Sequence, residues 1–116
     1  MSFEALMAEL KTGYVASLPD KAKTIQTQVE TGNAADLRDA FHKLKGTGRT
    51  YGVPEVSDLA RLVEELCATQ PHEAPAAARL AAAILHDIHA AHSQGRAFAL
   101  TDDARFLEIQ ALHPRS

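Results

Sequence analysis

The stretch AADLRDAFHKLKGTGRTY (residues 34–51) repeats apolar side chains at three- and four-residue spacing. This spacing predicts an amphipathic α-helix. Gly52 and Pro54 interrupt the pattern, and it resumes in PEVSDLARLVEELCAT (residues 54–69). Because the connection is so short, the two predicted helices should form an antiparallel hairpin.

Helical periodicity also covers the rest of the chain, and no run alternates in the manner of a β-strand. Apolar residues recur through residues 3–29 around Pro19, which predicts either two short helices or one bent helix. Residues 75–94 predict another helix, and residues 101–112 a last short one. The expected fold is therefore all-α: an antiparallel four-helix bundle with an additional N-terminal helix or kinked extension.

Length and charge exclude several classes of protein. The 116 residues fit one bundle domain spanning 1–116, although the tail from about residue 96 follows no specific pattern. The net charge of −3 gives no overall field that would attract nucleic acid or an anionic membrane. The N-terminus lacks the features of a signal peptide, and no apolar run is long enough to cross a bilayer. We expect a cytoplasmic monomer with neither a nucleic-acid nor a membrane partner.

A histidine stands at the centre of the outer face of the helix predicted at 34–51. At about 100° per residue, the apolar residues fall on one side of this helix: Leu37, Phe41, Leu44, Gly48 and Tyr51. His42 lies opposite, with Arg38, Lys45, Gly46 and Arg49 within about 60° of it. We therefore expect an exposed imidazole among cations. Like charges disfavour protonation of the ring, and the neutral ring keeps a nitrogen lone pair free to attack.

Two glycines inside the same helix require an explanation, since each costs about 1 kcal/mol relative to alanine. Gly46 lies on the outer face, where the missing side chain would let the backbone of a partner approach the imidazole. Gly48 lies on the inner face, where it would let a neighbouring helix pack closely.

The run FHKLKGTGRTYG (residues 41–52) resembles the signature of histidine phosphotransfer (HPt) domains, in which lysine and glycine follow the histidine at +3 and +4 and a further glycine at +10. Residues 54–66 are similar to the helix that pairs with the phosphorylated helix in that family. The resemblance is clearest over 34–66. Three residues depart from the family pattern: Phe41, Gly48 and Arg49.

The resemblance implies that His42 accepts a phosphoryl group from an aspartyl phosphate on a receiver domain and relays it to another. Lys45 would stabilise the transferring charge, and Gly46 would admit the receiver. The flanking cations are expected to contact the partner: Arg38, Lys43 and Arg49. The chain would be a phosphocarrier without kinase activity and without a cofactor of its own. Its partners would be response-regulator receiver domains, which supply the Mg²⁺, and a hybrid sensor histidine kinase.

Two other readings of the sequence remain open. The bundle would in one case dock or sequester receiver domains without being phosphorylated. In the other, the chain would be a metal-dependent enzyme in which His86, His89 and His92 bind the metal ion. Because three-residue steps turn by about 240° in total around a helix, these histidines are better explained as a solvated fringe. Cys67, the single cysteine, is expected to be a buried and unreactive thiol.

Overall fold

The structure, a computed structural model, describes residues 2–113 and contains no β-strand among them. Five α-helices make up almost all of it: α1 (Phe3–Thr31), α2 (Ala34–Thr50), α3 (Pro54–Thr69), α4 (Ala74–Ser93) and α5 (Ala104–Ala111). Two short 3₁₀ helices, η1 (Pro71–Glu73) and η2 (Leu100–Asp102), precede α4 and α5. The predicted all-α fold is confirmed.

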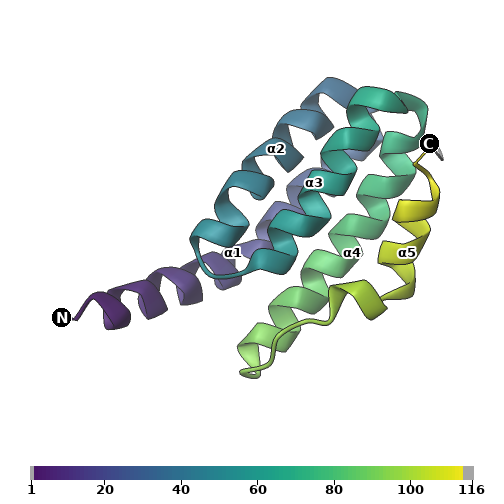
Figure 1. Ribbon diagram of the computed structural model, residues 1–116. Helices are drawn as coiled ribbons and strands as arrows, with labels where there is room; N and C mark the ends of the chain where they lie inside the picture. Colours follow the sequence, from purple (N-terminus) through teal and green to yellow (C-terminus); the bar gives the residue numbers. More distant parts are fainter. Residues whose placement is uncertain (1, 114–116) are drawn as a thin grey trace.

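Helices α1–α4 form the expected four-helix bundle, with α5 packed along the outside of α4 (Figure 1). The closest neighbours are α2 with α3 and α1 with α4, and α3 joins the two pairs by packing on α4. Figure 1 also shows that the N-terminal part of α1 projects beyond the bundle. The predicted N-terminal extension is thus part of a long first helix.

Pro19 does not divide α1, although the sequence left open two helices or one. Proline has no N–H, so the carbonyl of Val15, one turn earlier, loses its usual donor within the helix. His89 of α4 takes the place of the missing donor, with its Nδ1 2.9 Å from the Val15 oxygen. Because the carbonyl can only accept, Nδ1–H must be the donor. A hydrogen bond between helices thereby satisfies the oxygen that proline leaves free.

Local capping residues set the ends of the helices. Gly32 ends α1 in the left-handed conformation, with φ of 73°, which glycine adopts at little cost. The Asn33 side chain then accepts hydrogen bonds from the backbone N–H groups of Ala35 (2.9 Å) and Asp36 (3.3 Å) at the start of α2. Asp103 caps α5 in a similar way. The start of α2 is the one predicted from the sequence, and α5 lies within the range predicted for the last short helix.

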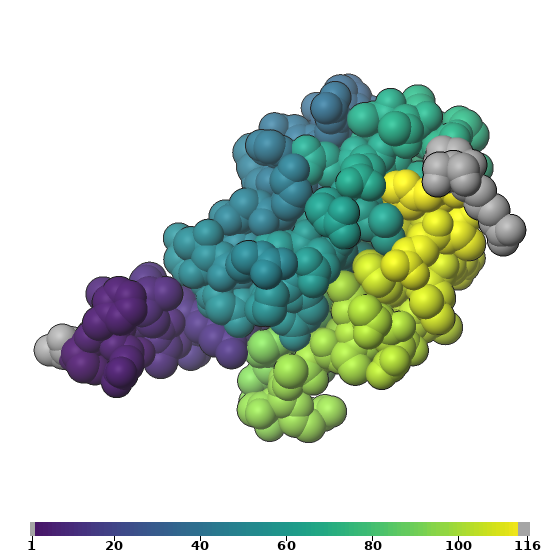
Figure 2. Space-filling view, in the orientation of Figure 1, coloured from purple at the N-terminus to yellow at the C-terminus, as the bar shows by residue number. Residues whose placement is uncertain are grey.

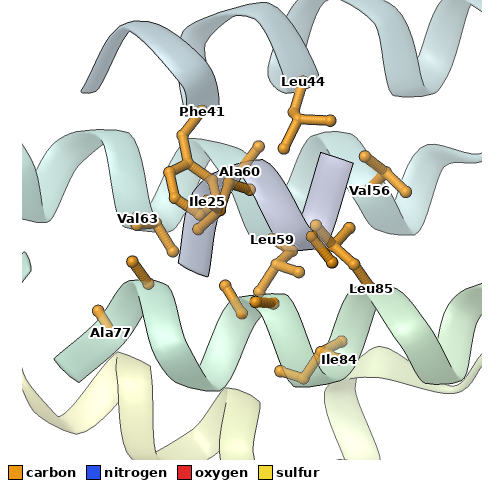
Figure 3. Close-up of a cluster of buried hydrophobic side chains, with 14 of the residues drawn as sticks. Ile25, Phe41, Leu44, Val56, Leu59, Ala60, Val63, Ala77, Ile84 and Leu85 are labelled. Carbon is orange, nitrogen blue, oxygen red and sulfur yellow. The ribbon is translucent and has the colours of Figure 1, made fainter. Parts of the chain in front are cut away.

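The core consists mainly of aliphatic side chains and alanine from all four helices of the bundle, with Phe41 as its largest fully buried side chain (Figure 3). Leu37, Phe41 and Leu44 of α2 are buried, as the helical projection predicted. Tyr51 is half-buried and stacks on Tyr14 of α1, with their ring centroids 5.2 Å apart. The inner face of α2 is thus used for packing, and its outer face is left exposed to solvent.

The C-terminal segment packs onto the bundle even though its sequence follows no specific pattern. The Arg105 guanidinium lies 2.8 Å from Asp103 and 2.7 Å from Asp87 of α4, which ties α5 to the bundle. His113, at the end of this segment, has Nε2 3.0 Å from the Leu62 carbonyl oxygen; residues 114–116 lie outside the described part. None of the helices between residues 2 and 113 combines the length and apolarity needed to cross a membrane.

The histidines of α4 correct one expectation. His86 is exposed, but the His92 side chain is only 8% exposed and its Nε2 lies 2.8 Å from Oε2 of Glu55. The same carboxylate oxygen accepts a hydrogen bond from the Phe98 N–H at 3.1 Å. The expectation that these histidines form a solvated fringe is therefore wrong for His92, and also for His89, whose ring bonds to the Val15 carbonyl. Glu55, the acidic residue in the first turn of α3, is itself buried.

The buried Glu55–His92 contact predicts acid sensitivity. Burial raises the pKa of Glu55, but hydrogen bonds from its own N–H, from His92 and from the Phe98 N–H outweigh burial and hold the pKa below its ordinary value. A carboxyl with a depressed folded-state pKa stabilises the fold above its unfolded-state pKa, and this contribution is lost as pH falls through the folded-state value.

We expect Glu55→Gln to lower the free energy of unfolding by about 2 kcal/mol at neutral pH, because the charged acceptor is lost. The difference from the unmodified chain should shrink as the solution is acidified. Urea unfolding followed by circular dichroism at successive pH values measures both effects. A difference that does not change with pH would contradict this account.

Candidate functional site

His42 lies in the middle of α2 on the side that faces solvent. Its side chain is 63% exposed, whereas its neighbour Phe41 is fully buried. The predicted exposure of the imidazole is therefore confirmed. Since the backbone of α2 is held by packing on α1 and α3, the position of this exposed ring is fixed by the core beneath it.

A carboxylate from α3 lies beside the ring. Glu64 Oε1 is 2.8 Å from His42 Nδ1, and Glu64 Oε2 is 2.7 Å from Lys45 Nζ. The Glu64 side chain is only 14% exposed, and Lys45 is 38% exposed. One carboxylate thus connects the imidazole to the lysine one helical turn further along α2.

This contact selects one protonation pattern of the imidazole. An ionised carboxylate can only accept hydrogen bonds, so Nδ1 of His42 carries the proton that it donates to Glu64. In the neutral ring the lone pair is then on Nε2, the nitrogen at the outer end of the exposed side chain. The arrangement presents a nucleophilic nitrogen to any molecule that approaches α2.

Glu64 keeps its charge at this site. Burial raises the pKa of its carboxyl, but hydrogen bonds and charge attraction from Lys45 and His42 outweigh burial, so the pKa lies below its ordinary value. The expectation that His42 is surrounded by cations alone is therefore wrong. The helical pattern of α3 did not reveal this contact, because Glu64 is one of several acids in that helix and only the packing of α3 on α2 brings it to the ring.

The other cations near His42 differ in their partners. Arg49 lies 2.9 Å from Asp58, and Lys43 lies 3.2 Å from Asp39; all four side chains are exposed. Arg38 is also exposed, and it forms no ion pair with another residue of the described chain. Of these three predicted contact residues, Arg38 can therefore meet a new anion without breaking an existing pair.

A hollow of about 560 Å³ opens beside His42 between the start of α2 and the end of α3. Arg38 and Glu64 border it, and much of its remaining wall is formed by alanines such as Ala34 and Ala68. Cys67 also contributes to the wall but is buried, and burial raises the pKa of its thiol to about 11. As predicted from the sequence, the thiol stays protonated and unreactive at neutral pH.

The two glycines of α2 have different surroundings. At Gly46, no neighbouring side chain or other helix lies within 4 Å of the point where a Cβ would stand. At Gly48 the same point is 2.7 Å from the Ser57 backbone nitrogen of α3. The role predicted for Gly48 in helix packing is confirmed. Nothing within the described chain requires a glycine at position 46.

Because α3 approaches α2 closely at Gly48, the Ser57 side chain reaches the backbone of α2. Its hydroxyl donates to the Lys45 carbonyl at 2.8 Å and accepts from the Arg49 N–H at 2.6 Å. In a regular helix, this carbonyl and this N–H would bond to each other. The serine hydroxyl therefore inserts into α2 and fixes the register of α3 against the turn that carries Lys45 and Gly46.

No group of three His, Cys, Asp or Glu side chains between residues 2 and 113 is placed to hold a metal ion. His89 and His92 are engaged with Val15 and Glu55, on different sides of α4 from the exposed His86. The structure thus gives no support to the metal site considered for these histidines.

Comparison with known proteins identifies the class to which this bundle and exposed histidine correspond. The pattern of the Hpt domain family matches residues 9–94, which is most of the chain. The chain therefore belongs to the Hpt domain family. Searches of curated proteins and of solved structures give no match. Hpt domains are phosphocarriers in two-component phosphorelays and are not kinases.

The glycine geometry predicts opposite effects of one methyl group on stability. Gly48→Ala should lower the free energy of unfolding by about 2 kcal/mol, because the methyl group overlaps Ser57. Gly46→Ala should raise it by up to about 1 kcal/mol, because alanine favours the helix and meets no atom there. Urea unfolding of both variants tests the pair; equal effects at the two positions would contradict the packing described above.

The His42–Glu64 contact predicts the tautomer of the ring. In the unmodified chain, ¹⁵N NMR of the neutral imidazole should show the proton on Nδ1. Glu64→Ala should shift the population toward a proton on Nε2, which free imidazole side chains prefer. Glu64→Gln is the matched control, because its amide oxygen can still accept from Nδ1–H. An unchanged spectrum in Glu64→Ala would exclude Glu64 as the residue that orients the ring.

Proposed function

We propose that this chain carries a phosphoryl group on Nε2 of His42 and relays it between receiver-domain aspartates in a two-component phosphorelay. The observation that supports this most directly is the exposed His42 ring, whose Nδ1 is bound to Glu64 so that the Nε2 lone pair is free. Membership of the Hpt domain family supports the same function.

In the proposed reaction, the Nε2 lone pair attacks the phosphorus of an aspartyl phosphate on the receiver. The N–P bond forms as the P–O bond to the aspartate breaks, and the aspartate leaves as a carboxylate with the bonding electron pair. No proton has to leave Nε2. The ring gains positive charge, which the Glu64 carboxylate stabilises through the Nδ1–H hydrogen bond 2.8 Å long. Transfer to a second receiver is the reverse of this step.

Lys45 and Gly46 have distinct proposed roles. Lys45 lies one turn from His42 and is partly exposed, so its ammonium group can approach the phosphoryl oxygens while Glu64 holds it near the ring. Gly46 leaves open space on the outer face of α2, which would admit the backbone of the receiver next to Nε2. Positioning and electrostatics would supply most of the catalysis, as is usual in phosphoryl transfer.

The partner would complete the site. We propose that Arg38, Lys43 and Arg49 contact the receiver domain, with Arg38 free to pair with one of its carboxylates. The Mg²⁺ ion and the acceptor aspartate would belong to the receiver, and a hybrid sensor histidine kinase would be the source of the phosphoryl group. The chain itself would act in the cytoplasm as a carrier without kinase activity.

Incubation with a ³²P-labelled receiver domain and Mg²⁺ tests the proposal. We expect label on this chain that is labile in acid and stable in base, as for a phosphorylated imidazole, and none in His42→Gln. Gly46→Leu should slow transfer at least about tenfold, because its side chain would occupy the space through which the receiver approaches.

Circular dichroism should show that both variants remain folded, since both positions are exposed. Binding of the receiver without label on the chain would instead indicate a docking module that is not phosphorylated. Label that persists in His42→Gln would show that another residue is the acceptor.

A further inference from the structure

The carboxylate of Glu64 holds the inner nitrogen of the His42 ring, on the side away from an approaching partner. Nδ1 of His42 lies 2.8 Å from Oε1 of Glu64, whose side chain is mostly buried. Figure 2 shows that α2 and α3, the helices that carry these two residues, lie side by side at the surface of the bundle. Because the two ring nitrogens are on opposite edges of the imidazole, a group bound to Nε2 would leave the hydrogen bond at Nδ1 intact.

The proton on Nδ1 decides how readily an N–P bond at Nε2 breaks. With this proton in place the phosphorylated ring is a cation, and it leaves as a neutral imidazole that takes the bonding electron pair. Without the proton, the ring has to leave as an imidazolate anion, which is a far poorer leaving group. The group that controls the proton on Nδ1 therefore controls the stability of the N–P bond.

Glu64 favours the protonated form of the phosphorylated ring. Burial raises the pKa of the Glu64 carboxyl, but the contacts with Lys45 and His42 hold this pKa below its ordinary value, so Glu64 is ionised at neutral pH. A carboxylate that accepts a hydrogen bond from Nδ1–H stabilises a cationic ring more than a neutral one. The contact therefore opposes loss of the Nδ1 proton.

The other charged groups near the ring do not cancel this effect. From α2, Arg38 and Asp39 line the hollow beside the ring, and Asp39 is already paired with the lysine four residues later. From α3, Cys67 lines the same hollow as a protonated, uncharged thiol. A phosphoryl group on Nε2 adds negative charge, which offsets the cations Arg38 and Lys45. Glu64 is left in direct contact with Nδ1.

We propose that the charge of Glu64 sets the lifetime of the phosphoryl group on His42, because it keeps Nδ1 protonated and the N–P bond easy to break at neutral pH. This inference rests on the proposed phosphorylation of His42 and concerns the fate of the phosphorylated ring. In hydrolysis, water attacks phosphorus and the N–P bond breaks with its electron pair going to Nε2. Neutral imidazole and dihydrogen phosphate are the products. The chain would thus pass its phosphoryl group on or lose it to water, and would not store it.

Chemical phosphorylation with phosphoramidate, which transfers a phosphoryl group to exposed imidazoles without a receiver, tests the proposal. The ³¹P NMR signal that is absent in His42→Gln belongs to this site, and its change with pH reports the proton on Nδ1. We expect Glu64→Gln to lower the midpoint of this titration by about one pH unit, since the amide keeps the hydrogen bond without the charge. Above both midpoints, Glu64→Gln should lose its phosphoryl group about tenfold more slowly, and below both midpoints the two rates should agree.

Glu65→Gln is the matched control, because it removes the neighbouring acid of α3, which pairs with Arg61 and not with the ring. It should change neither the titration nor the rate of hydrolysis. Urea unfolding of the phosphorylated chain is a second measurement that needs no variant. The midpoint should fall on unfolding, because the contact with Glu64 is lost.

The outcomes separate this proposal from the relay function. Equal pH profiles for Glu64→Gln and the unmodified chain, or a midpoint that does not move on unfolding, would overturn the role of Glu64 and leave the relay standing. A receiver that fails to load the chain, with the Glu64 effect still present after phosphoramidate treatment, would count against the relay alone. Absence of any signal that depends on His42 would overturn both.

Discussion

The close packing of α3 on α2 is the constraint on which the site depends. The hydroxyl of Ser57 reaches the backbone of α2 because Gly48 has no side chain, and it bonds to the Lys45 carbonyl and the Arg49 N–H. This contact fixes both the separation and the register of the two helices. At that register, Glu64, two turns further along α3, lies within hydrogen-bond distance of His42 and Lys45. A contact in the buried part of the hairpin thus determines the arrangement on its surface.

The site itself is a balance of exposure and restraint. For the proposed transfer, the His42 ring must be exposed to a partner, yet an unrestrained ring would sample several rotamers and both tautomers. Glu64 restrains the ring from the buried side through Nδ1 and leaves Nε2 in solvent. Because Glu64 is only 14% exposed and also bound by Lys45, it can do this without being displaced by water. Both glycines serve the same site, one by allowing α3 to approach and the other by leaving the outer face open.

Hydrogen bonds between helices also hold the opposite side of the bundle together. His89 compensates for the donor that Pro19 lacks, and His92 binds Glu55 where the chain turns toward α5. Both histidines looked like surface residues in the sequence, because their partners are distant in the chain. The point at which α1 leaves the bundle also depends on segments that are distant in the chain. The stripe of α1 is continuous, and only the length of the neighbouring helices decides where it ceases to be buried.

The sequence by itself determined the helices, their approximate ends, the buried side of α2 and the outward position of His42, with Gly46 and Gly48 on opposite faces. These features depend on periodicity, caps and residues within a few positions of one another, so the local sequence contains the information. Tertiary structure alone decided that Glu64 binds His42, that Ser57 enters α2, that α1 passes through Pro19 unbroken and that His92 is buried. Each of these depends on the rotation and register of two packed helices, which side-chain volumes across the core determine and no single helix encodes.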